Sequence, residues 1–317
     1  MTTEMDGDEL DAQDAWNAVR RAGVGRLLVD AFVRFRYGDG FSNSRALALQ
    51  TSLAVVPFML ALTGLAADID QERPARVLAA TIQAISPGSG QHDALAEAVT
   101  GGESSEDAGE IALAFGLAFS LISMTTAMGQ VERGLNRIYG IRRDRPAVAK
   151  YGRAAVITAV LAGPLAVGFL LLVAGGAFAD AMAQDYGWSG GAALTWNLVR
   201  WPVGLALLVF AIAVVLDRAP RRRQPTLSWL ALGSGIAVAI ASVATALLAL
   251  YVKVGDSFGE VYGPLAGIFA LLIWSLLSSI AVFYGAAVCA QLEACRAGHP
   301  EPVYDDPGPP RAKQVEG

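Results

Sequence analysis

Six long stretches without any charged residue constrain this chain more than any other feature of its sequence. Residues 46–67, 111–129, 154–178, 203–216, 228–250 and 263–290 contain no Asp, Glu, Lys or Arg. An α-helix needs about 20 apolar residues to cross the roughly 30 Å hydrocarbon layer of a membrane. The fourth stretch is short, but it becomes long enough when residues from Asn197 are added, with Trp196 and Trp201 as interfacial anchors. The pattern therefore predicts six membrane-spanning helices.

The composition agrees with this interpretation. Charged residues make up 17% of the chain, against about 25% in a typical soluble domain, and apolar residues make up 54%. The mean hydropathy is +0.44. We expect an all-α integral membrane protein whose six-helix membrane domain occupies residues 46–290. Its spans are predicted at about 46–67, 111–130, 154–178, 197–216, 228–250 and 263–290.

Lys and Arg are distributed unevenly between the two sides that six crossings define. Residues 1–45, 131–153, 217–225 and 290–317 lie on one side and hold six, seven, four and three of them, which is 20 of the 24 in the chain. Short loops rich in Lys and Arg stay in the cytoplasm during insertion. We therefore expect both termini to be cytoplasmic.

The chain ends and the first external connection carry separate predictions. Residues 1–14 are polar and acidic and residues 300–317 are rich in proline, so both segments are expected to be disordered. Within 15–37, apolar residues recur at helical spacing opposite arginines, which predicts an amphipathic helix in the cytoplasmic interface. A soluble helix that binds a partner is the alternative. The connection 68–110 is expected to hold short external helices.

The densest group of polar residues beside a predicted span follows the inner end of the second one. The helical phase continues here, with Glu132 and Asn136 on one face and Arg133 and Arg137 on another. Two interpretations are open: the group lines an inner vestibule, or it anchors the helix at the level of the lipid headgroups. The candidate vestibule residues are Gln50, Gln130, Glu132, Arg133, Asn136 and Arg137.

Prolines and glycines mark expected kinks and close helix contacts. A proline inside a helix cannot donate to the carbonyl four residues before it, so Pro57 predicts a kink in the first span and Pro164 one in the third. Gly263 and Gly267 lie four residues apart around Pro264 at the start of the last span. Such spacing of small residues is typical of close helix packing.

The sequence offers little for catalysis or cofactor binding. Its two histidines, His92 and His299, lie outside the six stretches, so no Ser-His pair or His-containing metal cluster forms within them. The chain also lacks a glycine-rich phosphate loop, which argues against a built-in ATP motor. We expect no catalytic residue, cofactor or metal site, and therefore no enzymatic activity.

The expected partners are those of a membrane protein. They are the lipid bilayer, anionic lipids at the basic inner loops, and a second copy of the chain or other membrane proteins. The basic loops lack the interleaved aromatic residues of a single-strand binding site, so nucleic acid is not expected.

Several short motifs occur in order along the chain: Arg45 to Gln50 with Pro57, Leu135 to Gly140, Arg200-Trp201-Pro202, Tyr262 to Gly267, and Gly285-Ala286 with Gln291 to Glu293. Together they resemble the YihY/virulence factor BrkB family over about residues 25–296. The resemblance implies a bacterial inner-membrane protein with six spans, and it brings an old ribonuclease BN label that is regarded as mistaken. Many members read Gly-Ala-Glu-Leu-Asn where this chain reads Gly285 to Cys289 without an acidic residue. Proton or cation coupling through that glutamate is therefore not expected here.

Three functions are open at this point. The leading hypothesis is a transporter or channel for a lipid-like or small amphiphilic molecule that is not driven by its own ATP hydrolysis. The alternative is a structural or assembly factor of the cell envelope that transports nothing. A membrane nuclease is the third and is disfavoured by the missing catalytic groups.

Overall fold

All regular secondary structure in the described part of the chain is helical. A computed structural model describes residues 10–67, 77, 106–254, 266–298 and 301. Its helices in chain order are α1 (Ala12–Ala22), α2 (Val24–Tyr37), α3 (Gly40–Ala67), α6 (Glu106–Ile138), α7 (Ala147–Val173), α8 (Gly175–Tyr186), α9 (Gly190–Arg218), α10 (Leu227–Val254) and α12 (Ala266–Arg296). No strand occurs among these residues. Every long segment thus forms its backbone hydrogen bonds within itself, as hydrocarbon requires.

Five helices in the described residues are long and apolar enough to cross a membrane. These candidate spans are Leu113–Ile138, Ala147–Val173, Gly190–Arg218, Leu227–Val252 and Gly267–Arg296. In the most apolar window of each, only 11% to 28% of the residues are buried inside the protein. In a water-soluble protein such segments would be buried in the core, whereas here most of their residues are at least partly exposed. The protein is therefore a multi-pass membrane protein.

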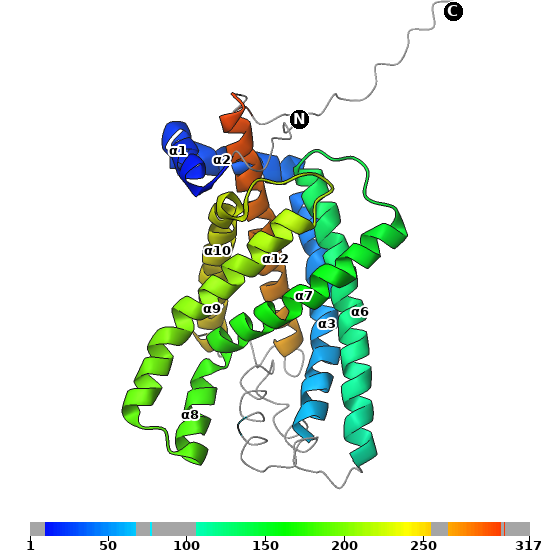
Figure 1. Cartoon of the computed structure of the whole chain (residues 1–317), viewed down its shortest axis with the longest axis vertical. Helices are drawn as coiled ribbons and strands as arrows, with labels where there is room; N and C mark the ends of the chain where they lie inside the picture. Colours follow the sequence, from blue (N-terminus) through cyan, green and yellow to red (C-terminus); the bar gives the residue numbers. More distant parts are fainter. Residues whose placement is uncertain (1–9, 68–76, 78–105, 255–265, 299–300, 302–317) are drawn as a thin grey trace, which may run out of the picture.

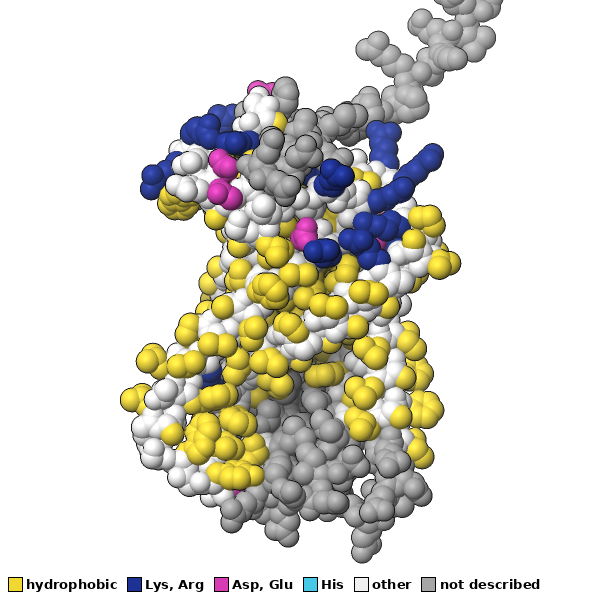
Figure 2. Space-filling view, viewed as in Figure 1, with side chains coloured by type: hydrophobic (Ala, Val, Ile, Leu, Met, Phe, Trp, Pro, Cys, Tyr) yellow, Lys and Arg dark blue, Asp and Glu magenta, His cyan; other side chains and the backbone are white. Residues whose placement is uncertain are grey.

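The outward-facing side chains form a continuous apolar surface. Figure 2 shows hydrophobic side chains over the middle of the molecule and Lys and Arg side chains gathered at one end. Large residues on α7, α9 and α10 are among the most exposed, for example Val160 at 64%, Leu198 at 74% and Leu247 at 61%. Exposed apolar surface of this extent marks a lipid-facing or protein-facing region. We call the end that carries the Lys and Arg side chains the basic end.

Helix α12 lies at the centre of the bundle and contacts α1, α2, α3, α6 and α10. Its closest neighbour is α10, where Gly233 faces Gly285 and a side chain on either glycine would overlap the other's backbone carbonyl. A similar contact joins α3 and α6, because Gly116 lies against the backbone of Pro57 and Ala61. Small residues permit such approaches in membranes, where packing drives association. α3 and α7 run as continuous helices through their prolines, Pro57 and Pro164.

The amino-terminal region differs from the sequence-based expectation. The helix predicted over 15–37 is two helices, α1 and α2, separated at Gly23, whose φ of 80° favours glycine. Residues 12–14 belong to α1 and Leu10 is fully buried, so the disorder predicted for 1–14 is wrong over its last residues. Residues 1–9 lie outside the described part.

The predicted apolar face of α2 is divided between protein and surroundings. Leu27, Ala31 and Phe35 are buried, and α2 packs against α12. Val24 and Phe32 are 59% and 46% exposed. One side of the predicted apolar face therefore packs on the protein, and the other side is exposed to the surroundings.

The long helices also differ from the predicted spans at their ends. α6 continues two turns past residue 130 because its polar end packs against loops at the basic end. The span predicted over 154–178 is divided at Ala174 into α7 and α8. The glycines Gly175 and Gly176 follow this break, and the side chain of Arg200 lies against them.

Some predictions fall outside the described residues. They concern the short helices of 68–110, where only Val77 and the first residues of α6 are described, the packing role of Gly263 and Pro264, and nearly all of the tail 300–317. Gly267 lies in the first turn of α12.

The contact between α10 and α12 gives a test of the packing. In Gly233→Ala the new methyl group overlaps the Gly285 carbonyl and the Cys289 sulfur, whereas in Gly235→Ala it meets nothing within 4 Å. We expect Gly233→Ala to lower the free energy of unfolding by about 1 to 3 kcal/mol through overpacking. Gly235→Ala should leave it unchanged or raise it by up to about 1 kcal/mol through helix propensity. Thermal unfolding in detergent measures both, and equal effects of the two changes would contradict this packing.

Candidate functional site

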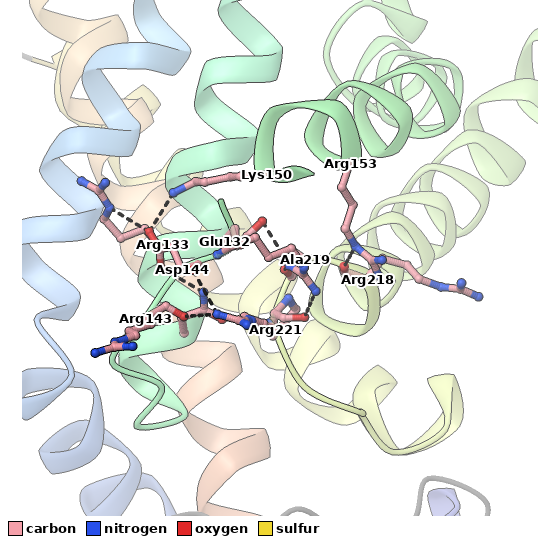
Figure 3. Close-up of polar contacts among 12 residues, drawn as sticks. Glu132, Arg133, Arg143, Asp144, Lys150, Arg153, Arg218, Ala219 and Arg221 are labelled. Atoms are coloured by element: carbon pink, nitrogen blue, oxygen red, sulfur yellow. Dashed lines mark hydrogen bonds and ion pairs between the residues drawn. The ribbon is translucent and has the colours of Figure 1, made fainter. Parts of the chain in front are cut away.

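Two loops far apart in the sequence meet at the basic end. They are residues 139–146, which join α6 to α7, and residues 219–226, which join α9 to α10. Arg145 joins them by donating from Nη1 to the carbonyl oxygen of Ala219 and from Nη2 to that of Pro220, both at 2.8 Å. Arg153 of α7 donates from Nε to the carbonyl oxygen of Arg218 at 2.8 Å (Figure 3). The ends of α6, α7, α9 and α10 are therefore tied together by side chains.

Asp144 is the central acceptor of this region. Its Oδ2 accepts from Lys150 Nζ at 2.9 Å and from Arg133 Nε at 3.3 Å, and its Oδ1 accepts from Asn136 Nδ2 at 3.0 Å. Burial raises the pKa of this carboxyl group, but the bonds from Lys150, Asn136 and Arg133 outweigh burial and lower the pKa from 3.8 to about 2. Asp144 is therefore a carboxylate at physiological pH.

Two buried residues near the end of α6, Asn136 and Glu132, contact the two loops. Asn136 is fully buried, and its Oδ1 accepts the backbone N–H of Arg221 at 2.8 Å. Glu132 is 3% exposed, and its Oε2 lies 3.1 Å from Arg145 Nη1. Arg221 also donates from Nη1 to the backbone carbonyl of Asp144 at 3.1 Å. We call this set the polar clamp: Glu132, Asn136, Asp144, Arg145, Lys150 and Arg221 (Figure 3).

A second, deeper ion pair lies between the α9–α10 loop and α12. Arg222 Nη2 is 2.6 Å from Glu293 Oε2, and the two side chains are 5% and 0% exposed. The guanidinium of Arg222 also lies 4.6 Å from the ring centroid of Tyr139. On the neighbouring turn of α12, Gln291 Oε1 accepts from Arg34 Nε of α2 at 3.1 Å. Removing one member of such a buried pair leaves an uncompensated charge, so these contacts fix α2, α12 and the loop relative to one another.

Polar side chains continue from the basic end into the bundle along α3. Gln130 Nε2 donates to Asn43 Oδ1 at 2.9 Å, and Ser52 Oγ lies 3.0 Å from Ser275 Oγ of α12. Gln50 lies between these contacts on α3, and its Oε1 is buried with no hydrogen-bond donor among the described residues. We call Asn43, Gln50, Ser52, Gln130 and Ser275 the polar seam. Asn43 and Ser52 are nine residues apart, or about 14 Å along an α-helix and about half a turn around it. Asn43 and Gln50 therefore share the side of α3 that faces α6, whereas Ser52 faces α12.

The six residues predicted to line an inner vestibule have three different surroundings. Gln50 and Gln130 belong to the polar seam. Glu132 and Asn136 belong to the polar clamp, on one face of α6 as the helical phase predicts. Arg133 and Arg137 are exposed, although Arg133 also reaches Asp144. The vestibule itself stays a prediction.

Several residues of this region were not singled out from the sequence. In the sequence, Asp144 and Arg145 are members of a basic loop, and Lys150 is one of several basic residues beside a predicted span. Glu293 belongs to a family motif and is a carboxylate at the end of an otherwise apolar run. The available signals were the single acidic residue within Arg142 to Arg145 and the isolated Glu293.

Asn136 provides a test of the polar clamp. Asn136→Ala removes the bonds to Asp144 and to the Arg221 backbone, so we expect it to lower the free energy of unfolding by about 1 to 3 kcal/mol. Arg137→Ala, one residue further on the exposed side of α6, should change it by less than about 0.5 kcal/mol. Thermal unfolding of both purified variants is the measurement. An Asn136→Ala protein as stable as Arg137→Ala would show that the clamp does not hold the loops.

Asp144 predicts a pH dependence. Its pKa is lowered in the folded protein, so its stabilising contribution is complete above its ordinary value of 3.8 and is lost as the pH falls toward about 2. We expect Asp144→Asn to unfold at a lower temperature than the wild type at pH 6, and the difference to shrink between pH 4 and pH 2. Asp180→Asn, at an exposed position on α8, serves as the control. A difference that does not depend on pH would contradict the assignment.

Comparisons with known proteins place this architecture in a family. A model of the family described as virulence factor BrkB matches residues 31–306. A Bacillus subtilis (strain 168) protein named "Putative ribonuclease-like protein YfkH" is 24% identical over 266 residues, which cover 84% of this chain and 94% of that protein. A UPF0761 membrane protein of Chromohalobacter salexigens is 28% identical over 273 residues, which cover 84% of this chain. Another, from Alteromonas mediterranea, is 30% identical over 184 residues, or 56% of this chain.

These matches differ in extent. They cover 63% of the Chromohalobacter protein and 58% of the Alteromonas protein, so both relatives contain sequence that has no counterpart in the alignment. No solved structure matches the chain significantly. The family match extends from α2 past the end of α12 and includes the polar clamp and the polar seam. The chain therefore belongs to the virulence factor BrkB family.

Proposed function

We propose that this protein crosses the bacterial cytoplasmic membrane six times, with both termini inside, and moves a lipid-like or small amphiphilic molecule without hydrolysing ATP itself. The polar seam carries the proposal. Polar side chains are costly inside a membrane and tend to be kept where they serve a pathway or a binding site. Polar groups on two sides of α3, from the basic end to the turn before Pro57, suit the polar head of an amphiphile that passes along this helix, while its apolar part stays in lipid.

The six-span topology rests on α3 as the additional crossing. α3 has 28 residues, is largely apolar and packs along α6 (Figure 1). With α3 included, 20 of the 24 Lys and Arg lie on one side of the membrane. This is the bias expected of cytoplasmic loops. An epitope tag after Gln314 should be protected in intact cells and reached only after lysis, and a label accessible from outside would reverse the proposed orientation.

The basic end supports contact with anionic lipids. Arg142, Arg143 and Arg137 are exposed, and their guanidinium groups form no ion pair among the described residues. Lys and Arg at the inner leaflet each contribute about 1 kcal/mol to binding of anionic lipid. α2 presents Val29 and Phe32, which are 63% and 46% exposed, at the same end. We propose that this exposed side of α2 lies in the headgroup region.

Lipid scrambling in liposomes tests the transport proposal. Purified protein reconstituted with a fluorescent phospholipid should move that lipid between leaflets, and small-solute release is followed in parallel. Gln50→Leu removes a polar group from the seam, and Pro57→Ala removes the expected kink, so we expect each to slow scrambling about tenfold, equivalent to about 1.4 kcal/mol in a barrier. Leu49→Ala, at an exposed neighbouring position, should leave the rate unchanged.

The outcomes separate the candidate functions. Wild-type protein that is folded but inert toward every lipid and solute would favour the structural or assembly role. If Gln50→Leu, Pro57→Ala and Leu49→Ala all scramble lipid at the same rate, transport does not depend on the polar seam.

We also propose that the chain is not a nuclease, although one relative's name contains "ribonuclease-like". The carboxylates at the basic end support this view, because Glu132, Asp144 and Glu293 are each engaged by Lys or Arg. Purified protein should leave structured RNA intact in the presence of divalent metals. Cleavage that persists through stringent purification would overturn this proposal.

A further inference from the structure

Arg200 is an isolated positive charge within a long apolar region. It is the only Lys or Arg between residues 154 and 217. It lies on α9, 18 residues before Arg218 at the basic end, which is about 27 Å along an α-helix. This length is close to the roughly 30 Å thickness of the hydrocarbon layer. In the proposed membrane arrangement, Arg200 therefore lies near the boundary opposite the basic end.

The break between α7 and α8 provides a seat for this side chain. A methyl group added to Gly175 would meet Arg200 Cδ at 2.9 Å and Nη1 at 3.0 Å, and one added to Gly176 would meet Nη1 at 3.3 Å. The guanidinium thus lies directly against the backbone at the start of α8. Any side chain larger than hydrogen at Gly175 would displace it.

The charge of Arg200 is not neutralised by the described residues. No ion pair of Arg200 is formed among them. Its Nε is fully buried and has no hydrogen-bond acceptor in the part of the chain that the structure describes. An arginine within an apolar span is costly unless it finds a counter-charge or reaches the headgroup region. The site is therefore suited to binding an anion that balances the charge of Arg200.

The aromatic residues around Arg200 identify the environment of that anion. Trp196 donates from Nε1 to the carbonyl oxygen of Gly175 at 2.7 Å, and its ring lies 5.0 Å from that of Phe178 and 6.0 Å from that of Trp188. Trp201 lies beneath the guanidinium, with Cζ 5.3 Å from its ring centroid. Tryptophans gather where hydrocarbon meets the lipid headgroups. A phosphate at this level belongs to a lipid.

We propose that the junction of α8 and α9 binds the phosphate group of a phospholipid in the leaflet opposite the basic end, with Arg200 as its counter-charge. The acyl chains would extend from Arg200 toward the basic end along α9, where Val203 and Phe210 are 42% and 52% exposed. This inference rests on the proposed membrane arrangement and is independent of transport. A free phosphate ion would use the same guanidinium but would gain nothing from the apolar surface.

Stepwise lipid binding, followed by native mass spectrometry of delipidated protein, tests the site. All measurements use an Arg142→Gln/Arg143→Gln background, so that lipid at the basic end does not mask the signal. The probes are phosphatidylglycerol, diacylglycerol with the same chains, and inorganic phosphate as competitor. Arg200→Gln and Gly175→Ala are compared with Gly190→Ala, whose added methyl group meets nothing within 4 Å.

We expect phosphatidylglycerol to bind and diacylglycerol not to bind. Arg200→Gln and Gly175→Ala should each weaken the tightest binding step about tenfold, as expected for loss of a charge-assisted hydrogen bond, while Gly190→Ala keeps the background affinity. Gly175→Ala keeps the arginine. If it leaves the affinity unchanged, the contact between Arg200 and Gly175 does not position the guanidinium for phosphate. Unchanged affinity in folded Arg200→Gln would overturn the site. Displacement of the lipid by an equal concentration of inorganic phosphate would show a free-anion site instead.

Loss of this binding is distinguishable from failure of the transport proposal. Scrambling is tested at Gln50 and Pro57 on α3, whereas phosphate binding is tested at the α8–α9 junction. A protein that scrambles lipid but binds no phosphate through Arg200 refutes only the second.

Discussion

Every peptide group that enters hydrocarbon must find its hydrogen-bond partner within its own helix, because lipid chains offer none. This constraint accounts for the helices of the described part of the chain, and α3 and α7 continue through Pro57 and Pro164 although each proline removes one of these bonds. It also explains how the helices associate. Lipid is as apolar as the side chains it surrounds, so the bundle is held by close packing. This includes close backbone approach, as at Gly233 and Gly285, and packing around fully buried large side chains such as Trp229 and Phe283.

Polar interactions concentrate at one end of this apolar body and give it a defined arrangement. The polar clamp joins four helices through two loops, and the Arg222–Glu293 pair fixes the loop against α12. These contacts are charged and largely buried, so they form only when the partner atoms meet in a specific geometry. Apolar packing alone would define the relative positions of the helices less precisely. The polar seam begins where this rigid end meets α3. Further along α3, the buried Oε1 of Gln50 has no hydrogen-bond donor among the described residues.

The sequence was sufficient to predict helices in the right places, because the hydrocarbon thickness sets their minimum length and charged residues mark their limits. The shared face of Glu132 and Asn136 also followed from helical phase alone. The break at Gly23 did not, since a glycine inside an amphipathic pattern is compatible with either a continuous helix or a turn. The division at Ala174 was missed because no proline or charged residue marks it, and the glycines that follow it, Gly175 and Gly176, are also common inside membrane helices.

The pairings were harder to predict than the helices. Arg222 and Glu293 are 71 residues apart, and their contact depends on how the α9–α10 loop folds over α12. Lys150 lies in the first turn of the apolar helix α7, where the sequence alone does not distinguish it from an ordinary headgroup anchor. Its partner Asp144 comes from the preceding loop. Hydropathy carries no information on such contacts, because it records which residues leave water and not which residues meet.

The central claim is that the exposed apolar faces of the helices contact lipid. Spin labels at Val160, Phe210 and Val243, which are 64%, 52% and 60% exposed on three different helices, test it most directly in reconstituted protein. Collisions with oxygen, which dissolves in hydrocarbon, are compared with collisions with a water-soluble nickel complex, and Val148 at the basic end, 89% exposed, serves as the aqueous reference. The account predicts that the three labels relax with oxygen and are shielded from nickel. Nickel access at all three positions equal to that at Val148 would contradict it.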